Sequence, residues 1–198
     1  MIKQLAKSIG EYKKDSLLSP AFVTGEVLME VAIPFLISFL IDNGINRGDM
    51  GTIWKIGGVL AAAALISLTC GVAAGKYAAR ASAGYARNLR RDMYNRVQEF
   101  SFSNIDKFSA SSIVTRLTTD VTNLQNAYQM IIRVAVRSPI MLIFSLIMAF
   151  KVNASLALIF LAAVPVLGIG LFLIASRAHP IFERVFRTYD RLNNVVQE

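Results

Sequence analysis

The sequence has little of the chemistry that most catalytic and metal sites require. It holds one cysteine, Cys70, and one histidine, His179, among 198 residues. A lone cysteine cannot form an internal disulfide or a multi-cysteine metal site. Because Cys70 lies in an apolar run, we expect a small buried hydrophobic residue there. No Ser/His/Asp set or paired carboxylates suggest catalysis, so we expect no catalytic residues and no metal site.

A phosphate-binding loop is also missing. The pattern G-x-x-x-x-G-K-[ST] does not occur, and "GVAAGKY" at Gly71–Tyr77 is one residue too short and lacks the Ser/Thr. We therefore expect that this chain by itself binds no cofactor, does not hydrolyse ATP and is not an enzyme.

Long uncharged runs are abundant by contrast. Ile56–Gly75 and Val152–Ser176 carry no charge, and each can cross the roughly 30 Å hydrocarbon core of a bilayer as a helix. Leu17–Ile41 is apolar apart from two glutamates, and Ser138–Phe150 is a shorter uncharged run. The sequence predicts an all-α membrane protein with four spans, at about 17–45, 52–100, 111–150 and 152–198.

The distribution of positive charge predicts the orientation. The net charge is +8, with 21 Lys and Arg against 13 Asp and Glu. If the N-terminus is cytoplasmic, the two outer loops hold three of these cations, Arg47, Lys55 and Lys151, and the other eighteen lie inside. This is the positive-inside asymmetry of a multi-pass protein in a cell membrane, and it argues against nucleic-acid binding.

The first sixteen residues, "MIKQLAKSIGEYKKDS", do not look like a cleavable signal. They mix charge with apolar residues and lack a short apolar core followed by a cleavage site. This pattern favours an amphipathic elbow helix over 1–16 that lies on the inner membrane surface.

Three of the predicted helices are longer than a membrane crossing needs. Beyond Gly75 an apolar stripe continues at helical spacing through Ala79, Ala83, Ala86 and Leu89. Residues 57–100, 111–150 and 152–198 would form helices of roughly 60–70 Å at 1.5 Å per residue. We expect all three to extend about 30 Å into the cytoplasm. The first two extensions would be joined at residues 101–111, either by a short crosswise helix at about 103–108 or by a plain hairpin turn.

Two pairs of charges lie within the membrane part of the first and third predicted spans. Glu26 and Glu30 are one turn apart in the first span, and Arg133 and Arg137 are one turn apart in the third. Counted from the outer ends of their helices, the two pairs lie at depths that agree within about 3 Å. Charges in a span usually pair or face water. We expect the pairs to meet, and to lock one state or line a substrate path, unless both arginines reach the inner headgroups instead.

The whole chain resembles the membrane half of a drug- or lipid-exporting ABC transporter. "IDKFSASSIVTRLTTDVTNLQ" is similar to the family's first intracellular loop, where an "FD…G-E-L-I-S-R-L-x-x-D" run follows the coupling helix. "NLRRDMYNRVQEFSF" and "LIDNGINRGD" resemble the segments before that loop and at the end of the first span. The resemblance implies the exporter transmembrane fold and alternating access driven by ATP.

The resemblance also implies partners and roles for particular residues. A second half-transporter, nucleotide-binding domains with ATP and Mg, the bilayer and a hydrophobic or amphipathic small-molecule substrate are expected. Ser111-Ser112 replace the family's Gly-Glu, which favours a heterodimer. Arg116 and Asp120 are expected in the stalk, as tip-positioning residues or as an ordinary exposed ion pair. The contact with the nucleotide-binding domain is expected at Asn104, Ile105, Asp106, Lys107 and Phe108.

Relatives continue into two more spans and a nucleotide-binding domain that this sequence does not contain, so we expect a partial chain. A four-span scaffold or assembly protein, whose stalk binds a partner without transport, is the alternative function. A soluble basic helical bundle is the other alternative, and the uncharged runs argue against it.

Overall fold

The computed structural model describes residues 5, 7–99 and 110–197, and throughout these ranges the regular structure is helical. Four helical segments are long and apolar enough to cross a membrane: Gly10–Ile45, Met50–Gln98, Ser111–Val152 and Ala154–Ala178. The expectation of an all-α protein with four membrane-crossing helices is confirmed. The expected crosswise helix at about 103–108 lies outside the described residues.

The first hairpin joins α2 to α3 through a tight turn. The 3-10 turn η1 (Gly10–Tyr12) leads into α2 (Lys13–Leu40), which ends in a widened π-helical turn, η2 (Ile41–Ile45). Gly44 is required here because a Cβ atom would lie 2.9 Å from Ile53 Cγ1. Asp49 then caps α3 by accepting a 2.9 Å hydrogen bond from the Gly51 amide.

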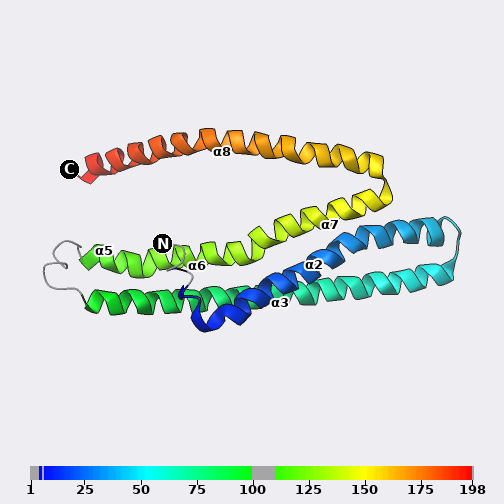
Figure 1. The fold of residues 1–198 in the computed structure, drawn as a ribbon, viewed down its shortest axis with the longest axis horizontal. Coiled ribbons are helices and arrows are strands. Elements are labelled where there is room, and N and C mark those ends of the chain that lie inside the picture. The colour runs from blue at the N-terminus through cyan, green and yellow to red at the C-terminus, as the bar shows by residue number, and fades with distance from the viewer. Residues whose placement is uncertain (1–4, 6, 100–109, 198) are drawn as a thin grey trace. The chain divides into compact units, whose positions relative to one another are not determined.

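Helix α3 (Met50–Gln98) is the longest helix of the described chain. Its 49 residues give a length of about 73 Å at 1.5 Å per residue, more than twice the thickness of the hydrocarbon core. α2 crosses α3 and packs against it, as Figure 1 shows. α3 is therefore long enough to form both a span and an extension into water.

The third membrane-crossing segment is one helical rod with two widened turns. It runs through α5 (Ala110–Thr115), η3 (Arg116–Asp120), α6 (Val121–Met130), η4 (Ile131–Ala135) and α7 (Val136–Val152), with η3 and η4 in π geometry. The widening at η4 has a local cause, because Pro139 lacks an N–H and its ring crowds the carbonyl of Ala135. Near η3, Thr118 and Thr122 donate to carbonyls four residues earlier, which competes with the regular ladder.

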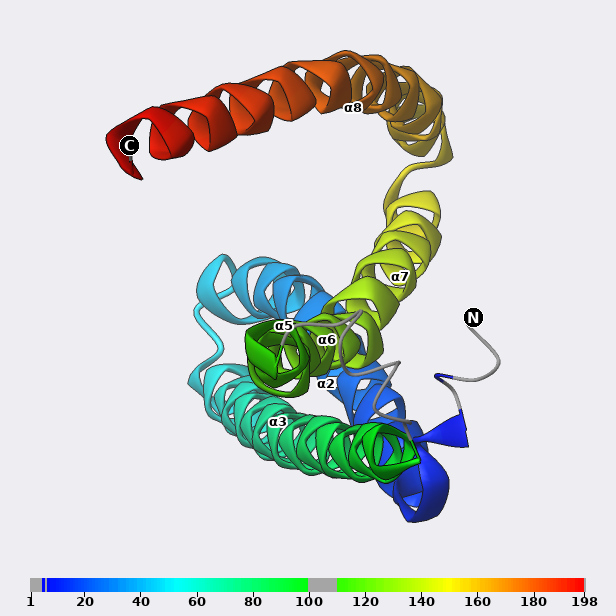
Figure 2. The same ribbon diagram turned by 90° about the vertical axis from the view of Figure 1, so that its left-hand side faces the viewer.

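The chain divides into two compact units, 1–145 and 146–198. The first contains α2, α3 and most of the third rod, and Figure 2 looks nearly along α3 and α6, which lie side by side. The second contains the end of α7 and α8 (Ala154–Gln197). Asn153 precedes α8 and caps it, since its side-chain oxygen accepts hydrogen bonds from the amides of Ser155 and Leu156.

Small residues form the interface of α3 with α2 and the third rod. Ala74, Ala78 and Ala81 are fully buried, whereas Ala79 and Ala83 are exposed. The expected apolar stripe is thus wrong at its first two positions and right from Ala86 onward. The reason is that alanine alone carries too little hydrophobic contrast to identify the buried face.

The N-terminal segment packs on the extension of α3. The Tyr12 ring lies on Gly84, where a Cβ atom would come 2.3 Å from Tyr12 Cδ2. Ser8 donates a 3.1 Å hydrogen bond to Asp92 and accepts another at its carbonyl from the Asn88 side chain. α2 begins at Lys13, so the last four residues of the expected 1–16 elbow belong to α2.

Candidate functional site

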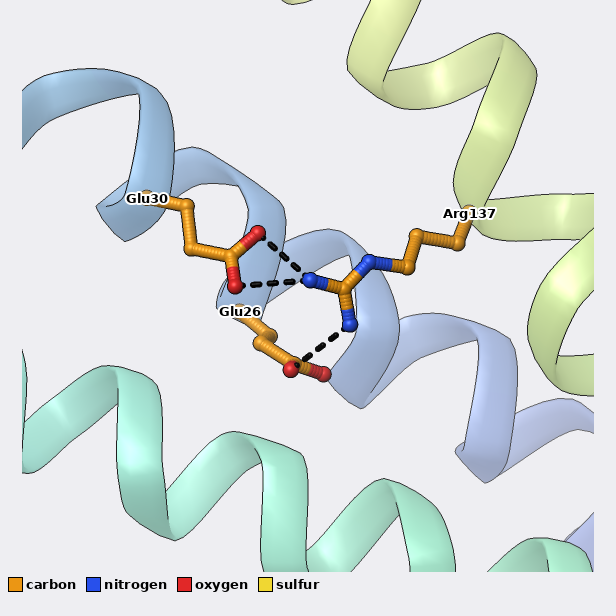
Figure 3. A network of polar contacts seen from close by, with 3 residues as sticks. All are labelled: Glu26, Glu30 and Arg137. Atoms are coloured by element: carbon orange, nitrogen blue, oxygen red, sulfur yellow. Dashed lines mark hydrogen bonds and ion pairs between the residues drawn. The ribbon is translucent and has the colours of Figure 1, made fainter.

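Arg137 joins the two glutamates of α2. Its Nη1 donates to Glu26 Oε1 at 2.9 Å, and its Nη2 contacts Glu30 Oε1 and Oε2, each at 2.7 Å. Figure 3 shows the guanidinium between the two carboxylates, reaching across from the third rod to α2. One arginine therefore holds two acidic side chains that are a helical turn apart.

The local sequence sets this geometry. Glu26 and Glu30 are four residues apart on a regular helix, so both side chains lie on the same face of α2. On the other helix, Arg137 follows the widened turn η4 and precedes Pro139. A π turn adds a residue to the helical circuit, which rotates everything after it relative to everything before it. Arg133 lies within the widened turn and Arg137 follows it, so the two side chains have different surroundings.

The network is only partly shielded from its surroundings. Glu26 is 9% exposed, while the side chains of Arg137 and Glu30 are each 32% exposed. Oε2 of Glu26 has less than 1 Å² of accessible area and no hydrogen-bond partner. Gly71 of α3 makes room for this carboxylate, since a Cβ atom there would lie 3.1 Å from Oε1. A buried carboxylate oxygen without a donor is a cost that proteins rarely leave uncompensated.

Arg133 does not join the ion-pair network. Within the described residues it forms no ion pair, and its guanidinium lies beside Gly75, where a Cβ atom would be 3.6 Å from Nη1. It lines a cleft of about 630 Å³ between α2, α3 and η4. The walls of this cleft are formed by Glu26, Ile33, Ala64, Ser67, Leu68, Gly71, Val72, Gly75, Lys76 and Arg133.

Taken together, these side chains form a charged site inside the membrane-crossing part of the molecule. Two carboxylates and one guanidinium leave the network with one excess negative charge, and the nearby Arg133 and Lys76 add two positive charges. In a medium of low dielectric, such charges attract ligands or one another strongly. The arrangement can hold two helices together and can bind a polar group, but it carries no nucleophile placed beside a base.

The other predicted site residues lie elsewhere. Arg116 and Asp120 begin and end η3, and both side chains are exposed. The five predicted contact residues for a nucleotide-binding domain, 104–108, are outside the described part of the chain. Among the described residues, no group of His, Cys, Asp or Glu side chains is arranged to hold a metal ion.

Sequence reasoning missed Lys76, Gly71 and Gly75. The signal was present in "GVAAG", where two glycines four residues apart in an apolar helix are typical of a surface that another helix approaches closely. Here the two glycines accommodate charged side chains, Glu26 and Arg133, rather than another backbone.

Comparisons with known proteins agree with this architecture. A family model described as the ABC transporter transmembrane region matches residues 17–198. The chain is 32% identical over 173 residues to the uncharacterized ABC transporter ATP-binding protein YfiB of Bacillus subtilis. The aligned region covers 87% of this chain and 30% of that protein. An uncharacterized ABC transporter ATP-binding protein of Mycobacterium tuberculosis is 30% identical over 86% of this chain and 29% of its own length.

A more distant relative has a named activity. An ATP-dependent lipid A-core flippase of Albidiferax ferrireducens is 22% identical over 98% of this chain and 34% of its own length. The chain thus spans about a third of the length of the curated relatives it matches. The matched family is the transmembrane region and not a nucleotide-binding domain. With four membrane-crossing helices and a match over most of its length, the chain belongs to the ABC transporter transmembrane family, as a multi-pass membrane protein.

Proposed function

We propose that this chain forms part of the substrate pathway of an ATP-driven exporter and transmits closure of the nucleotide-binding domains to the spans. The observation that carries the proposal is the length of α3, about 73 Å, in a chain of this family. A helix that extends far beyond the bilayer can move its membrane half when its cytoplasmic end is moved. Residues 104–108 are the proposed contact with the nucleotide-binding domain, and Arg116 and Asp120 position that contact.

The exported molecule is proposed to be hydrophobic or amphipathic. Support comes from the lipid A-core flippases among the relatives and from the amphipathic cleft beside Glu26 and Arg133. The working unit is proposed to be a dimer with a second half-transporter, with a heterodimer favoured by Ser111-Ser112. ATP and Mg would bind the nucleotide-binding domains. The protein is proposed to lie in the bacterial inner membrane with its N-terminus on the cytoplasmic side, and the distribution of positive charge supports this orientation.

The proposal can be tested without knowing the substrate. The background is the full-length protein with Cys70→Ala and with any other cysteine also replaced. One variant then carries a single cysteine at Ser67, in the cleft, and a second variant carries a single cysteine at Leu65, which is exposed on α3. Thiol labelling is measured in proteoliposomes, first without nucleotide and then with ATP and vanadate.

We expect labelling at position 67 to change severalfold with nucleotide and labelling at position 65 to stay constant. Adding Phe108→Ala should abolish the nucleotide effect while ATP hydrolysis continues, because the tip would no longer transmit closure. Equal labelling of position 67 in both states, with hydrolysis intact, would contradict the proposed coupling.

A further inference from the structure

We propose that the cleft along α3 binds one membrane phospholipid with a primary ammonium headgroup, of the phosphatidylethanolamine type. The phosphate would lie between Arg133 and Lys76, and the ammonium group would contact Glu26. This inference rests on the proposed function, in which the same cleft accommodates an amphipathic molecule, and it names the class of lipid that the cleft binds.

The cleft has a charged end and an apolar end. Glu26, Lys76 and Arg133 line one end, and Ala64 lies at the other. From Lys76 to Ala64 the cleft follows twelve residues of α3, or about 18 Å, which is close to half the thickness of a hydrocarbon core. The wall between them is formed by Val72, Leu68 and small residues. A lipid headgroup would contact the charged end of the cleft, and an acyl chain would lie along the apolar wall.

The depth of the charged end agrees with a headgroup. Glu26 lies sixteen residues from Asp42 at the opposite end of its span, or about 24 Å along the helix. In a hydrocarbon core of about 30 Å this places Glu26 near the opposite interface, where lipid headgroups begin. An acyl chain that starts here runs toward Ala64 in the same direction as the lipids of that leaflet.

Two cations are available for the phosphate. Arg133 and Lys76 form no hydrogen bond or ion pair with the described residues, although both line the same cleft. Unpaired charges at this level of a membrane are costly, and a phosphate diester is the anion that lipids supply there. Charge-assisted hydrogen bonds from both side chains to one phosphate would satisfy them together.

The carboxylate of Glu26 selects the rest of the headgroup. Its Oε1 is taken by Arg137, while Oε2 has no donor, and the two glutamates together exceed the charge of Arg137 by one. A primary ammonium group supplies both the positive charge and the N–H donors once the side chain turns toward the cleft. A quaternary ammonium group carries the same charge without any N–H. Phosphatidylcholine should therefore bind more weakly than phosphatidylethanolamine.

Native mass spectrometry of the full-length protein in detergent tests the proposal, with phosphatidylethanolamine, phosphatidylcholine and phosphatidylglycerol of identical chains titrated separately. We expect one phosphatidylethanolamine per chain, bound about tenfold more tightly than phosphatidylcholine, as a charged hydrogen bond implies. Arg133→Gln with Lys76→Gln should weaken binding of both by about tenfold or more. Glu26→Gln should remove the preference between them and retain binding.

Arg80→Gln is the matched control, since Arg80 is an exposed cation one turn beyond Lys76 and does not line the cleft. It should leave lipid binding unchanged, and circular dichroism melts establish that each variant is folded. Equal binding of phosphatidylcholine and phosphatidylethanolamine by the wild type would overturn the ammonium contact. Tighter binding of phosphatidylglycerol would make this a plain anion site. An equal loss from Arg80→Gln would show that the cations act only through overall charge. Each of these three outcomes refutes the proposal, and none bears on whether ATP drives coupling.

Discussion

Arg137→Gln is expected to destabilise the unit 1–145 by about 2–4 kcal/mol. Removing one partner of a buried ion pair costs roughly 3–5 kcal/mol, because the other charge is left buried and unpaired, and Glu26 is 9% exposed. Pairs with the exposure of Glu30 and Arg137 contribute about 0–1 kcal/mol. The partial exposure of Arg137 itself reduces the first figure, which gives the range expected here.

The cost should come from stranded charge rather than lost packing. The triple variant Arg137→Gln, Glu26→Gln and Glu30→Gln removes all three charges and keeps side chains of similar size. Replacing a buried charge network with neutral groups is often close to neutral in stability. We therefore expect the triple variant to lie within about 1 kcal/mol of wild type, and so to be more stable than the single variant that it contains.

Unfolding in mixed micelles of SDS and a mild detergent, followed by circular dichroism, measures both differences. Arg80→Gln serves as the control and should change stability by no more than about 0.5 kcal/mol, as for other exposed positions. If the free energy of unfolding of Arg137→Gln is also within about 0.5 kcal/mol of the wild-type value, the carboxylates reach water and the ion pairs do not stabilise the fold. A triple variant as unstable as the single one would attribute the loss to packing instead.

Three further changes test the contacts outside this network. Gly84→Leu should cost about 1–3 kcal/mol and speed proteolysis of the N-terminal segment, because the new side chain occupies the place of the Tyr12 ring. Tyr128→Phe removes the 2.8 Å hydrogen bond that its hydroxyl donates to α2, and should cost about 1 kcal/mol in the same micelle assay. The pKa of Asp49 is lowered, first by the hydroxyl of Thr52, so its contribution to stability is present above the ordinary carboxyl pKa and lost as the pH falls through the lowered value. The stability difference between wild type and Asp49→Ala should therefore shrink between pH 6 and pH 3.

The glycine and tyrosine changes each have a matched control. Gly58→Leu enlarges a glycine of α3 that has no neighbouring atom within 4 Å, so it should not affect proteolysis at the N-terminus. Tyr94→Phe alters an exposed tyrosine of the same helix and should leave stability unchanged. A pH-independent effect of Asp49→Ala would mean that the cap acts without its charge. If Gly58→Leu has the same effect as Gly84→Leu, the contact of the Tyr12 ring with Gly84 is refuted. If Tyr94→Phe has the same effect as Tyr128→Phe, the hydrogen bond from Tyr128 is refuted.

The spans could be predicted from the sequence because lipid imposes a local requirement. A helix crosses a bilayer when about twenty consecutive residues are apolar, whatever its neighbours are. Ile56–Gly75 and Val152–Ser176 meet that condition; α3 includes the whole first run, and α8 includes the second from Ala154 onward. The excess length of α3 followed in the same way, since nothing in residues 76–98 ends a helix. The family resemblance rested on motifs of the same local kind.

The partners of the charges had to come from the tertiary structure. Equal spacing made Arg133 and Arg137 indistinguishable in the sequence, yet a turn widened near Pro139 separates their surroundings and gives both glutamates to Arg137. The alanines of α3 likewise revealed their buried face only once packed against α2 and the third rod. Which residues enter a membrane depends on each segment alone, whereas which residues meet there depends on how two helices rotate about their axes. Here small residues and a single proline set that rotation, and neither produces a hydrophobic pattern from which it could be predicted.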